Sequence, residues 1–90
     1  MSIEDLFLII EKRVKNKKKN SYTNKLLKLG PKKIAQKLGE ETTELIIDYL
    51  NGSKKRTIEE AVDLIYHLLV LLKSKKITMS EINKELDRRK

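Results

Sequence analysis

The hydrophobic positions of this chain recur every three or four residues, and no segment alternates between apolar and polar positions as a strand does. The spacing predicts an all-α fold, with a first helix over about 3–14 and others over 23–29, 31–50 and 57–74, and with a last helix that carries Ile82 and Leu86. Gly30-Pro31 separates the second and third helices, because proline is favoured as a first helical residue. The Asn51-Gly52-Ser53 turn is short, so helices 31–50 and 57–74 are expected to pack antiparallel.

Three hydroxyl residues, each followed three positions later by an acid, indicate where helices begin. Ser2 with Asp5 resembles the start of the first helix, Thr57 with Glu60 resembles a capping box that opens helix 57–74, and Thr78 with Glu81 opens the last helix. Between the first two helices the run 15–20 is rich in lysine, and we expect a solvated, charged loop there.

The length of 90 residues predicts one domain, 1–90, with a small core. There is no cysteine, no apolar run long enough for a membrane span and an acidic start at Glu4-Asp5, which fits a cytoplasmic protein. The net charge of +8 suits an anionic partner, such as a nucleotide, a nucleic acid or an acidic membrane surface.

Against this positive charge, seven of the thirteen acidic residues gather in two clusters, 40–48 and 59–63. Asp63 interrupts an apolar stretch, where a carboxylate is costly unless it is paired or bound to a metal. On helix 31–50 a stripe of Lys37, Glu41, Glu44 and Asp48 borders an apolar face of Ile34, Leu38, Leu45 and Tyr49. Across an antiparallel hairpin, four carboxylates are expected to converge on a hard cation such as Mg²⁺: Glu41, Glu44, Glu60 and Asp63.

Other interpretations compete with this one for each residue. Glu40, on the flank of the stripe, could be a solvated surface charge, and Glu60 could serve only the capping box. Asp63 could be paired with Lys37. His67 is a single histidine in an apolar helix, which is more often a satisfied core residue than a ligand, and Glu-x-x-His spacing for a di-iron site is absent.

The spacing Glu40-Glu41-x-x-Glu44, followed after fifteen residues by Glu60-x-x-Asp63, resembles the signature of the all-α nucleotide pyrophosphohydrolases of the MazG-like class. Within that class the chain is similar to the phosphoribosyl-ATP pyrophosphohydrolase family, which acts in the second step of histidine biosynthesis. Five segments carry this narrower similarity: 21–27, 30–35, 37–41, 51–52 and 60–72. The first contains Ser21-Tyr22-Thr23 and the last contains Tyr66-His67.

This resemblance implies hydrolysis of phosphoribosyl-ATP to phosphoribosyl-AMP and pyrophosphate, with Mg²⁺ as cofactor or Mn²⁺ in its place. It assigns the metal ligands to Glu41, Glu44, Glu60 and Asp63, and Glu40 to a further ion or to the attacking water. The candidates for holding the phosphates are Lys25, Lys33 and Lys37. The candidates for contacting the nucleotide or sugar are Ser21, Tyr22 and Thr23. A fused cyclohydrolase domain, present in many relatives, is not expected in 90 residues.

A homodimer is expected, because the apolar residues of helix 57–74 point in nearly every direction and the other helices offer only single stripes to cover them. Two other functions remain open at this stage. One is a house-cleaning hydrolase of non-standard nucleoside triphosphates from the same class, and the other is a small basic nucleic-acid-binding module. Few aromatic residues and the acidic clusters argue against the second, so neither a nucleic acid nor a membrane is expected as partner.

Overall fold

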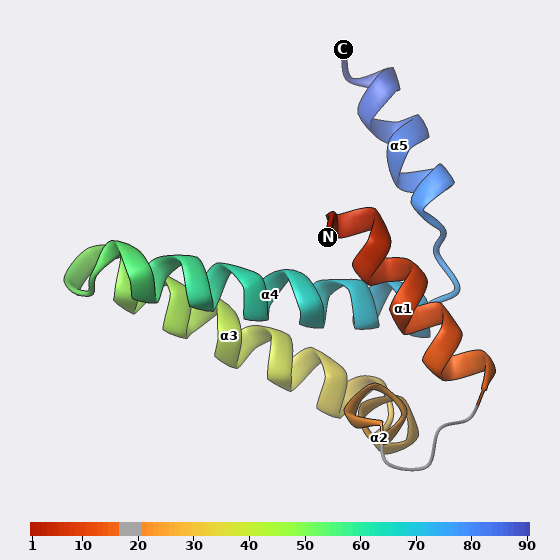
Figure 1. Ribbon diagram of the computed structural model, residues 1–90, viewed down its shortest axis with the longest axis horizontal. Helices are drawn as coiled ribbons and strands as arrows, with labels where there is room; N and C mark the ends of the chain where they lie inside the picture. Colours follow the sequence, from red (N-terminus) through yellow and green to blue (C-terminus); the bar gives the residue numbers. More distant parts are fainter. Residues whose placement is uncertain (17–20) are drawn as a thin grey trace.

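The computed structural model describes residues 1–16 and 21–90, and within these ranges it is all-helical, with five α-helices and no strand. The predicted all-α class is therefore confirmed. The helices are α1 (Ile3–Lys15), α2 (Tyr22–Leu29), α3 (Pro31–Asn51), α4 (Lys54–Ser74) and α5 (Met79–Arg88) (Figure 1). Lys17, Lys18 and Lys19, in the predicted charged loop, lie outside the described residues.

The helix starts predicted at Ser2 and Thr78 are confirmed. Both are capping boxes, since each hydroxyl accepts a backbone N–H and each acid three residues later accepts from the cap backbone. The box predicted at Thr57 is wrong. Helix α4 begins three residues earlier, at Lys54, with the Ser53 hydroxyl accepting from the Arg56 N–H at 3.1 Å. The Thr57 hydroxyl is directed to the Asp48 carbonyl oxygen, 3.2 Å away on α3. Glu60 is thereby released from any capping role.

Two glycines make the connections on either side of α3. Gly30 has a φ of 95°, a conformation that side chains with a Cβ rarely adopt, and Pro31 follows it as the first residue of α3. At Gly52 an added Cβ would lie 2.8 Å from Oδ1 of Asp48 and 2.9 Å from its carbonyl oxygen. The turn after α3 can therefore be closed in two residues, Gly52 and Ser53.

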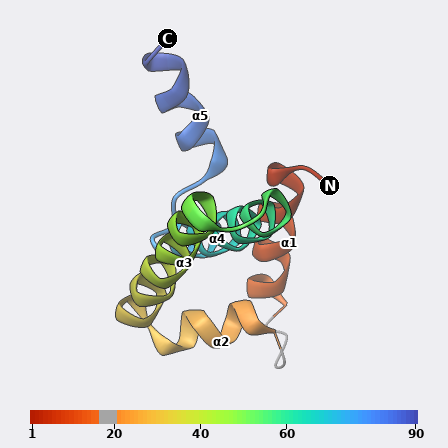
Figure 2. The ribbon, with the colours of Figure 1, turned by 90° about the vertical axis from the view of Figure 1, so that its left-hand side faces the viewer.

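Helices α3 and α4 form the predicted antiparallel hairpin, in which they lie close together near the turn and separate toward α2 (Figures 1 and 2). Helix α1 packs on the C-terminal half of α4, and α2 connects the end of α1 to the start of α3 (Figure 2). The apolar core lies where these four helices meet, and its buried members in the described chain are Phe7, Ile10, Leu26, Ile34, Leu69 and Val70.

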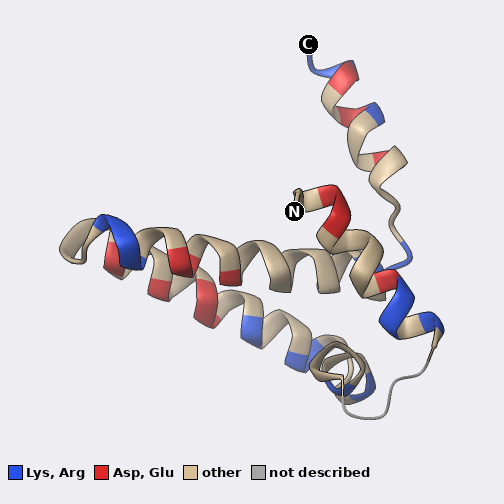
Figure 3. Cartoon of the chain, in the orientation of Figure 1, with Lys and Arg blue, Asp and Glu red and all other residues tan. Residues whose placement is uncertain are grey.

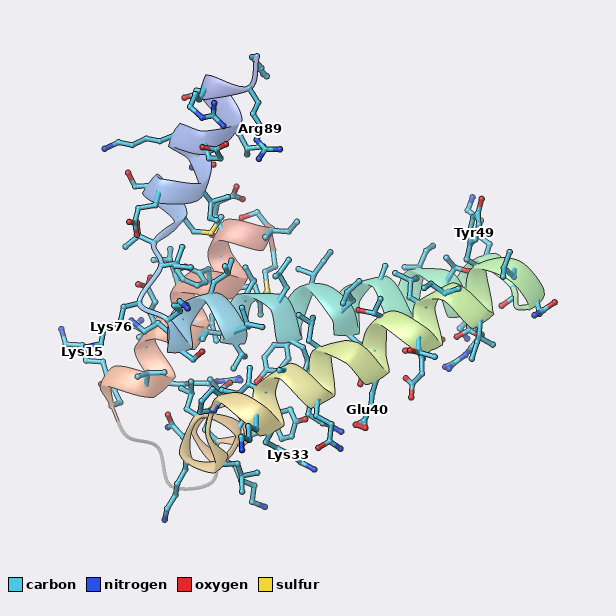
Figure 4. The ribbon with its side chains drawn as sticks, turned by 180° about the vertical axis from the view of Figure 1, so that it is seen from behind. Lys15, Lys33, Glu40, Tyr49, Lys76 and Arg89 are labelled. Carbon is cyan, nitrogen blue, oxygen red and sulfur yellow. The ribbon has the colours of Figure 1, made fainter. Side chains whose placement is uncertain are left out.

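The opposite end of the hairpin has no such cover from the described residues. Tyr49, predicted on the apolar face of α3, is 74% exposed in the single chain (Figure 4). Further along α4, Val62 and Leu68 are also exposed in the single chain, and burial of this helix all round was expected only in a dimer. Helix α5 projects away from the other helices and contains no buried residue (Figure 1). Among the described helices, none is apolar over a length sufficient to cross a bilayer.

Candidate functional site

The acidic residues of α3 and α4 face one another along the middle of the hairpin (Figure 3). Three of them, Glu41, Glu60 and Asp63, each place a carboxylate oxygen within 4.8 Å of the others. Glu44 is adjacent and interacts with the carboxyl group of Glu60, but it does not belong to this tightest group. The antiparallel register thus brings together the four residues that the sequence predicted to converge, three of them closely.

The burial of these carboxylates differs from the prediction. Asp63 was expected to be enclosed by the apolar helix around it, yet it is exposed, whereas Glu60 is only 4% exposed. The alternative pairing of Asp63 with Lys37 is not made, because the Lys37 ammonium lies 3.7 Å from the carboxylate of Glu40.

Glu60 has a partner that sequence reasoning missed. Nη2 of Arg56, one helical turn earlier on α4, lies 2.7 Å from Oε1 of Glu60. The same guanidinium lies 3.6 Å from Oδ2 of Asp48 and 3.4 Å from Oε1 of Glu59. The i,i+4 spacing of Arg56 and Glu60 on one helix could have predicted this contact. That prediction would have needed α4 to begin before residue 57.

Two buried oxygens at this site have no hydrogen-bond partner among the described residues, Oε2 of Glu41 and Oε2 of Glu60. Burial raises the pKa of Glu60, and the neighbouring Glu44 carboxyl raises it further, while Arg56 opposes both effects. Unpaired buried oxygens among like charges destabilise a folded chain unless a cation or proton offsets them. All-oxygen ligands of this kind fit a hard divalent cation such as Mg²⁺ or Mn²⁺.

Glu40 lies outside this group. Its side chain is exposed, paired with Lys37, and points away from α4 (Figure 4). The predicted basic residues of α3, Lys33 and Lys37, are half-buried and lie two turns and one turn before Glu41 on the same helix (Figures 3 and 4). Lys25 is exposed on α2.

Side chains of the segment Ser21-Tyr22-Thr23, at the start of α2, form hydrogen bonds with side chains of α4. Ser21 caps α2 by accepting from the Asn24 N–H at 3.4 Å, and the fully buried Thr23 shares a hydrogen bond between its hydroxyl and that of Tyr66. These placements argue against direct contact of Ser21 and Thr23 with a substrate, and we interpret both as residues that position their neighbours. Tyr22 remains 45% exposed, with its ring stacked at 6.1 Å on that of Tyr66.

His67 is a satisfied core residue, as its position in an apolar helix favoured. Its Nδ1 lies 2.7 Å from the carbonyl oxygen of Asp63, which can only accept, so Nδ1 carries the proton. Nε2 of the neutral ring then accepts from the Tyr22 hydroxyl at 3.2 Å. The chain of hydrogen bonds thus runs from α2 through His67 to the backbone of Asp63.

Replacing Tyr22 by phenylalanine should lower the free energy of unfolding by about 1 kcal/mol, because the Nε2 hydrogen bond is lost while the ring packing is kept. Urea unfolding at one fixed protein concentration measures the change. The wild type at the same protein concentration is the reference. A free energy of unfolding equal to that of the wild type would show that the hydroxyl of Tyr22 contributes nothing through His67.

The sequence is similar to those of known proteins over nearly its whole length. The sequence model of the phosphoribosyl-ATP pyrophosphohydrolase family matches residues 3–90. A phosphoribosyl-ATP pyrophosphatase of Sulfolobus acidocaldarius is 49% identical over 87 residues, which cover 97% of this chain and 92% of the relative. The enzymes of that name from Sulfurisphaera tokodaii and Clostridium novyi are 45% and 44% identical, over 97% and 98% of this chain and 93% and 80% of their own length.

Proposed function

Because the chain belongs to the phosphoribosyl-ATP pyrophosphohydrolase family, we propose that its α3–α4 carboxylate group holds Mg²⁺ for that reaction. The chain hydrolyses phosphoribosyl-ATP to phosphoribosyl-AMP and pyrophosphate, the second step of histidine biosynthesis. The observation that carries the metal proposal is the approach of Glu41, Glu60 and Asp63 to within 4.8 Å, with buried oxygens of the two glutamates left unpartnered.

The ligands proposed are Glu41, Glu44, Glu60 and Asp63. Bound there, Mg²⁺ would offset the negative charge of the phosphates and lower the pKa of a ligated water. Glu44 is exposed and interacts with the carboxyl group of Glu60, which supports its place as the fourth ligand. Glu40, exposed on the flank, is proposed to orient the attacking water or to bind a second ion.

The basic residues on the same side of the hairpin are proposed to hold the polyphosphate. Lys33 and Lys37 continue the acidic stripe of α3 toward α2, so an anionic substrate can lie along α3 with its cleaved bond over the carboxylates. Lys25, exposed on α2, is also proposed to contact the phosphates, and Tyr22, exposed on the same helix, is proposed to contact the nucleotide or sugar. Ser21 and Thr23 support Tyr22 and Tyr66 from within the fold.

Release of pyrophosphate from phosphoribosyl-ATP, measured beside a panel of non-standard nucleoside triphosphates, tests the substrate. We expect phosphoribosyl-ATP to be preferred in kcat/KM by at least about a hundredfold, or about 2.7 kcal/mol. Titration with EDTA should remove the activity, and Mg²⁺ or Mn²⁺ should restore it. Preference for a nucleoside triphosphate would support the house-cleaning alternative, and activity in excess EDTA would contradict the metal proposal.

We also propose that residues 1–90 act as one domain without a cyclohydrolase activity of their own, and that two copies form the active unit. The radius of gyration is 14.1 Å, whereas a compact chain of 90 residues is expected at about 12 Å. The excess comes from the uncovered end of the hairpin and the projecting α5 (Figure 1). The lack of cysteine agrees with a site of action in a reducing cytoplasm.

A further inference from the structure

We propose that Arg56 is a positioning residue that favours Mg²⁺ over Ca²⁺ at the carboxylate group. Arg56 occupies one oxygen of Glu60, and Glu60 is therefore left to bind an ion through its other oxygen alone. This inference rests on the metal site proposed above and extends it from the choice of ligands to the choice of ion. Arg56 does not belong to the spacing pattern of carboxylates that identified the site, and its part follows from its contacts alone.

The first observation is that the two oxygens of Glu60 have different surroundings. Oε1 accepts from Nη2 of Arg56 at 2.7 Å, while Oε2 is buried without a partner among the described residues. The side chain as a whole is 6% exposed. Turning the carboxylate so that both oxygens face Glu41 and Asp63 would break a charge-assisted hydrogen bond in a partly buried place, which is costly.

The second observation is that Arg56 is itself held by several groups. Its guanidinium lies 3.6 Å from Oδ2 of Asp48 on α3 and 3.4 Å from Oε1 of Glu59 on α4. Asp48 and Glu60 together raise the pKa of the Arg56 guanidinium, so it keeps its charge. Contacts with both helices restrict the guanidinium to the neighbourhood of Glu60 and give its hydrogen bond a fixed direction.

Ion chemistry connects this geometry to selectivity. Mg²⁺ needs nearly octahedral coordination with oxygens at about 2.1 Å, and single-oxygen carboxylate ligands suit it. Ca²⁺ takes six to eight oxygens at about 2.4 Å and commonly obtains them from carboxylates that bind through both oxygens. A glutamate whose one oxygen is held toward an arginine is turned away from binding an ion through both oxygens, so Arg56 disfavours the larger ion.

A charge effect has to be separated from this positioning effect. A positive group beside the site repels Mg²⁺ and Ca²⁺ alike, because both carry the same charge. Removing Arg56 should therefore tighten the binding of both ions through charge, and should tighten Ca²⁺ more through the freed oxygen. Lys55 is the matched control, since it is an exposed cation on the same helical turn, and Lys55→Met removes the same charge.

Isothermal titration of the full chain with MgCl₂ and with CaCl₂ tests the proposal in the wild type, Arg56→Met and Lys55→Met. We expect the ratio of Ca²⁺ to Mg²⁺ affinity to rise at least about fivefold in Arg56→Met and to stay unchanged in Lys55→Met. Equal ratios in all three proteins would overturn the role of Arg56. Absence of any Mg²⁺ binding by the wild type would overturn the metal site itself, so the two failures are distinct.

Helix content by circular dichroism shows whether Arg56→Met folds. Should it fail to fold, Arg56→Lys takes its place, because lysine keeps the charge but makes a single-point contact that holds the carboxylate less firmly. The expected rise in the affinity ratio is then smaller, about twofold. A ratio equal to that of the wild type in a folded Arg56→Lys would count against the proposal, since charge is conserved and only the geometry is altered.

Discussion

Asp63→Asn is expected to abolish metal-dependent release of pyrophosphate while the helix content stays unchanged. The amide has the shape of the carboxylate but no charge, and Asp63 is one of the three residues whose oxygens approach to within 4.8 Å. Because Asp63 is exposed and lies within a long helix, the substitution disturbs no core contact. We expect kcat/KM with Mg²⁺ to fall at least about a hundredfold, which corresponds to about 2.7 kcal/mol of transition-state stabilisation.

The same substitution should stabilise the metal-free protein. Asp63 contributes to raising the pKa of Glu60, which means that its negative charge disfavours the ionised form of Glu60. Removing that charge relieves the repulsion, so the midpoint of thermal unfolding in EDTA is expected to rise. Asp87→Asn on α5 is the control, since it makes the same chemical change on a helix that contributes nothing to the carboxylate group. Full activity of Asp63→Asn with Mg²⁺ would contradict the role proposed for this residue.

Helical periodicity and capping chemistry predicted most of the fold because both are local. Ser2 and Thr78 were identified as caps from residues three positions apart, and Gly30-Pro31 from its own conformational restrictions. The start of α4 was missed because Ser53 and Thr57 are both competent caps. The apolar pattern begins only at Ile58, so the polar turn 54–57 carried no periodic signal to decide between them.

The acidic residues of the site could be predicted because their spacing fixes which side of a helix they share. Their burial could not, because it depends on which helix covers that side. Glu60 is buried and Asp63 exposed, the reverse of what the apolar neighbours of Asp63 suggested. The contact of Tyr22 with His67 joins residues 45 positions apart, and only the packing of α2 against α4 brings them together.

A second copy of this chain should cover the uncovered end of the hairpin. Large apolar side chains, each more than half exposed, lie there on both helices: Ile46, Ile47, Tyr49, Leu50 and Ile58. Val62, also more than half exposed, follows one turn further along α4, beside the start of α1. Contiguous apolar surface of this kind is typical of an interface. At micromolar concentration, sedimentation equilibrium should give about twice the chain mass of 10.5 kDa. A single-chain mass with full activity under these conditions would refute the dimer.

Val62→Lys should separate the two copies, because a two-fold interface would bury the new charge twice without a partner. We expect the dissociation constant to rise at least about a hundredfold, or about 3 kcal/mol, by sedimentation. Gln36→Lys adds the same charge at an exposed polar position of α3 and is expected to leave the dimer intact. If basic residues of segment 21–33 act across the interface, Val62→Lys should also lose activity on dilution, and activity should return as the protein concentration rises. Activity independent of concentration in Val62→Lys would show that each chain holds a complete site.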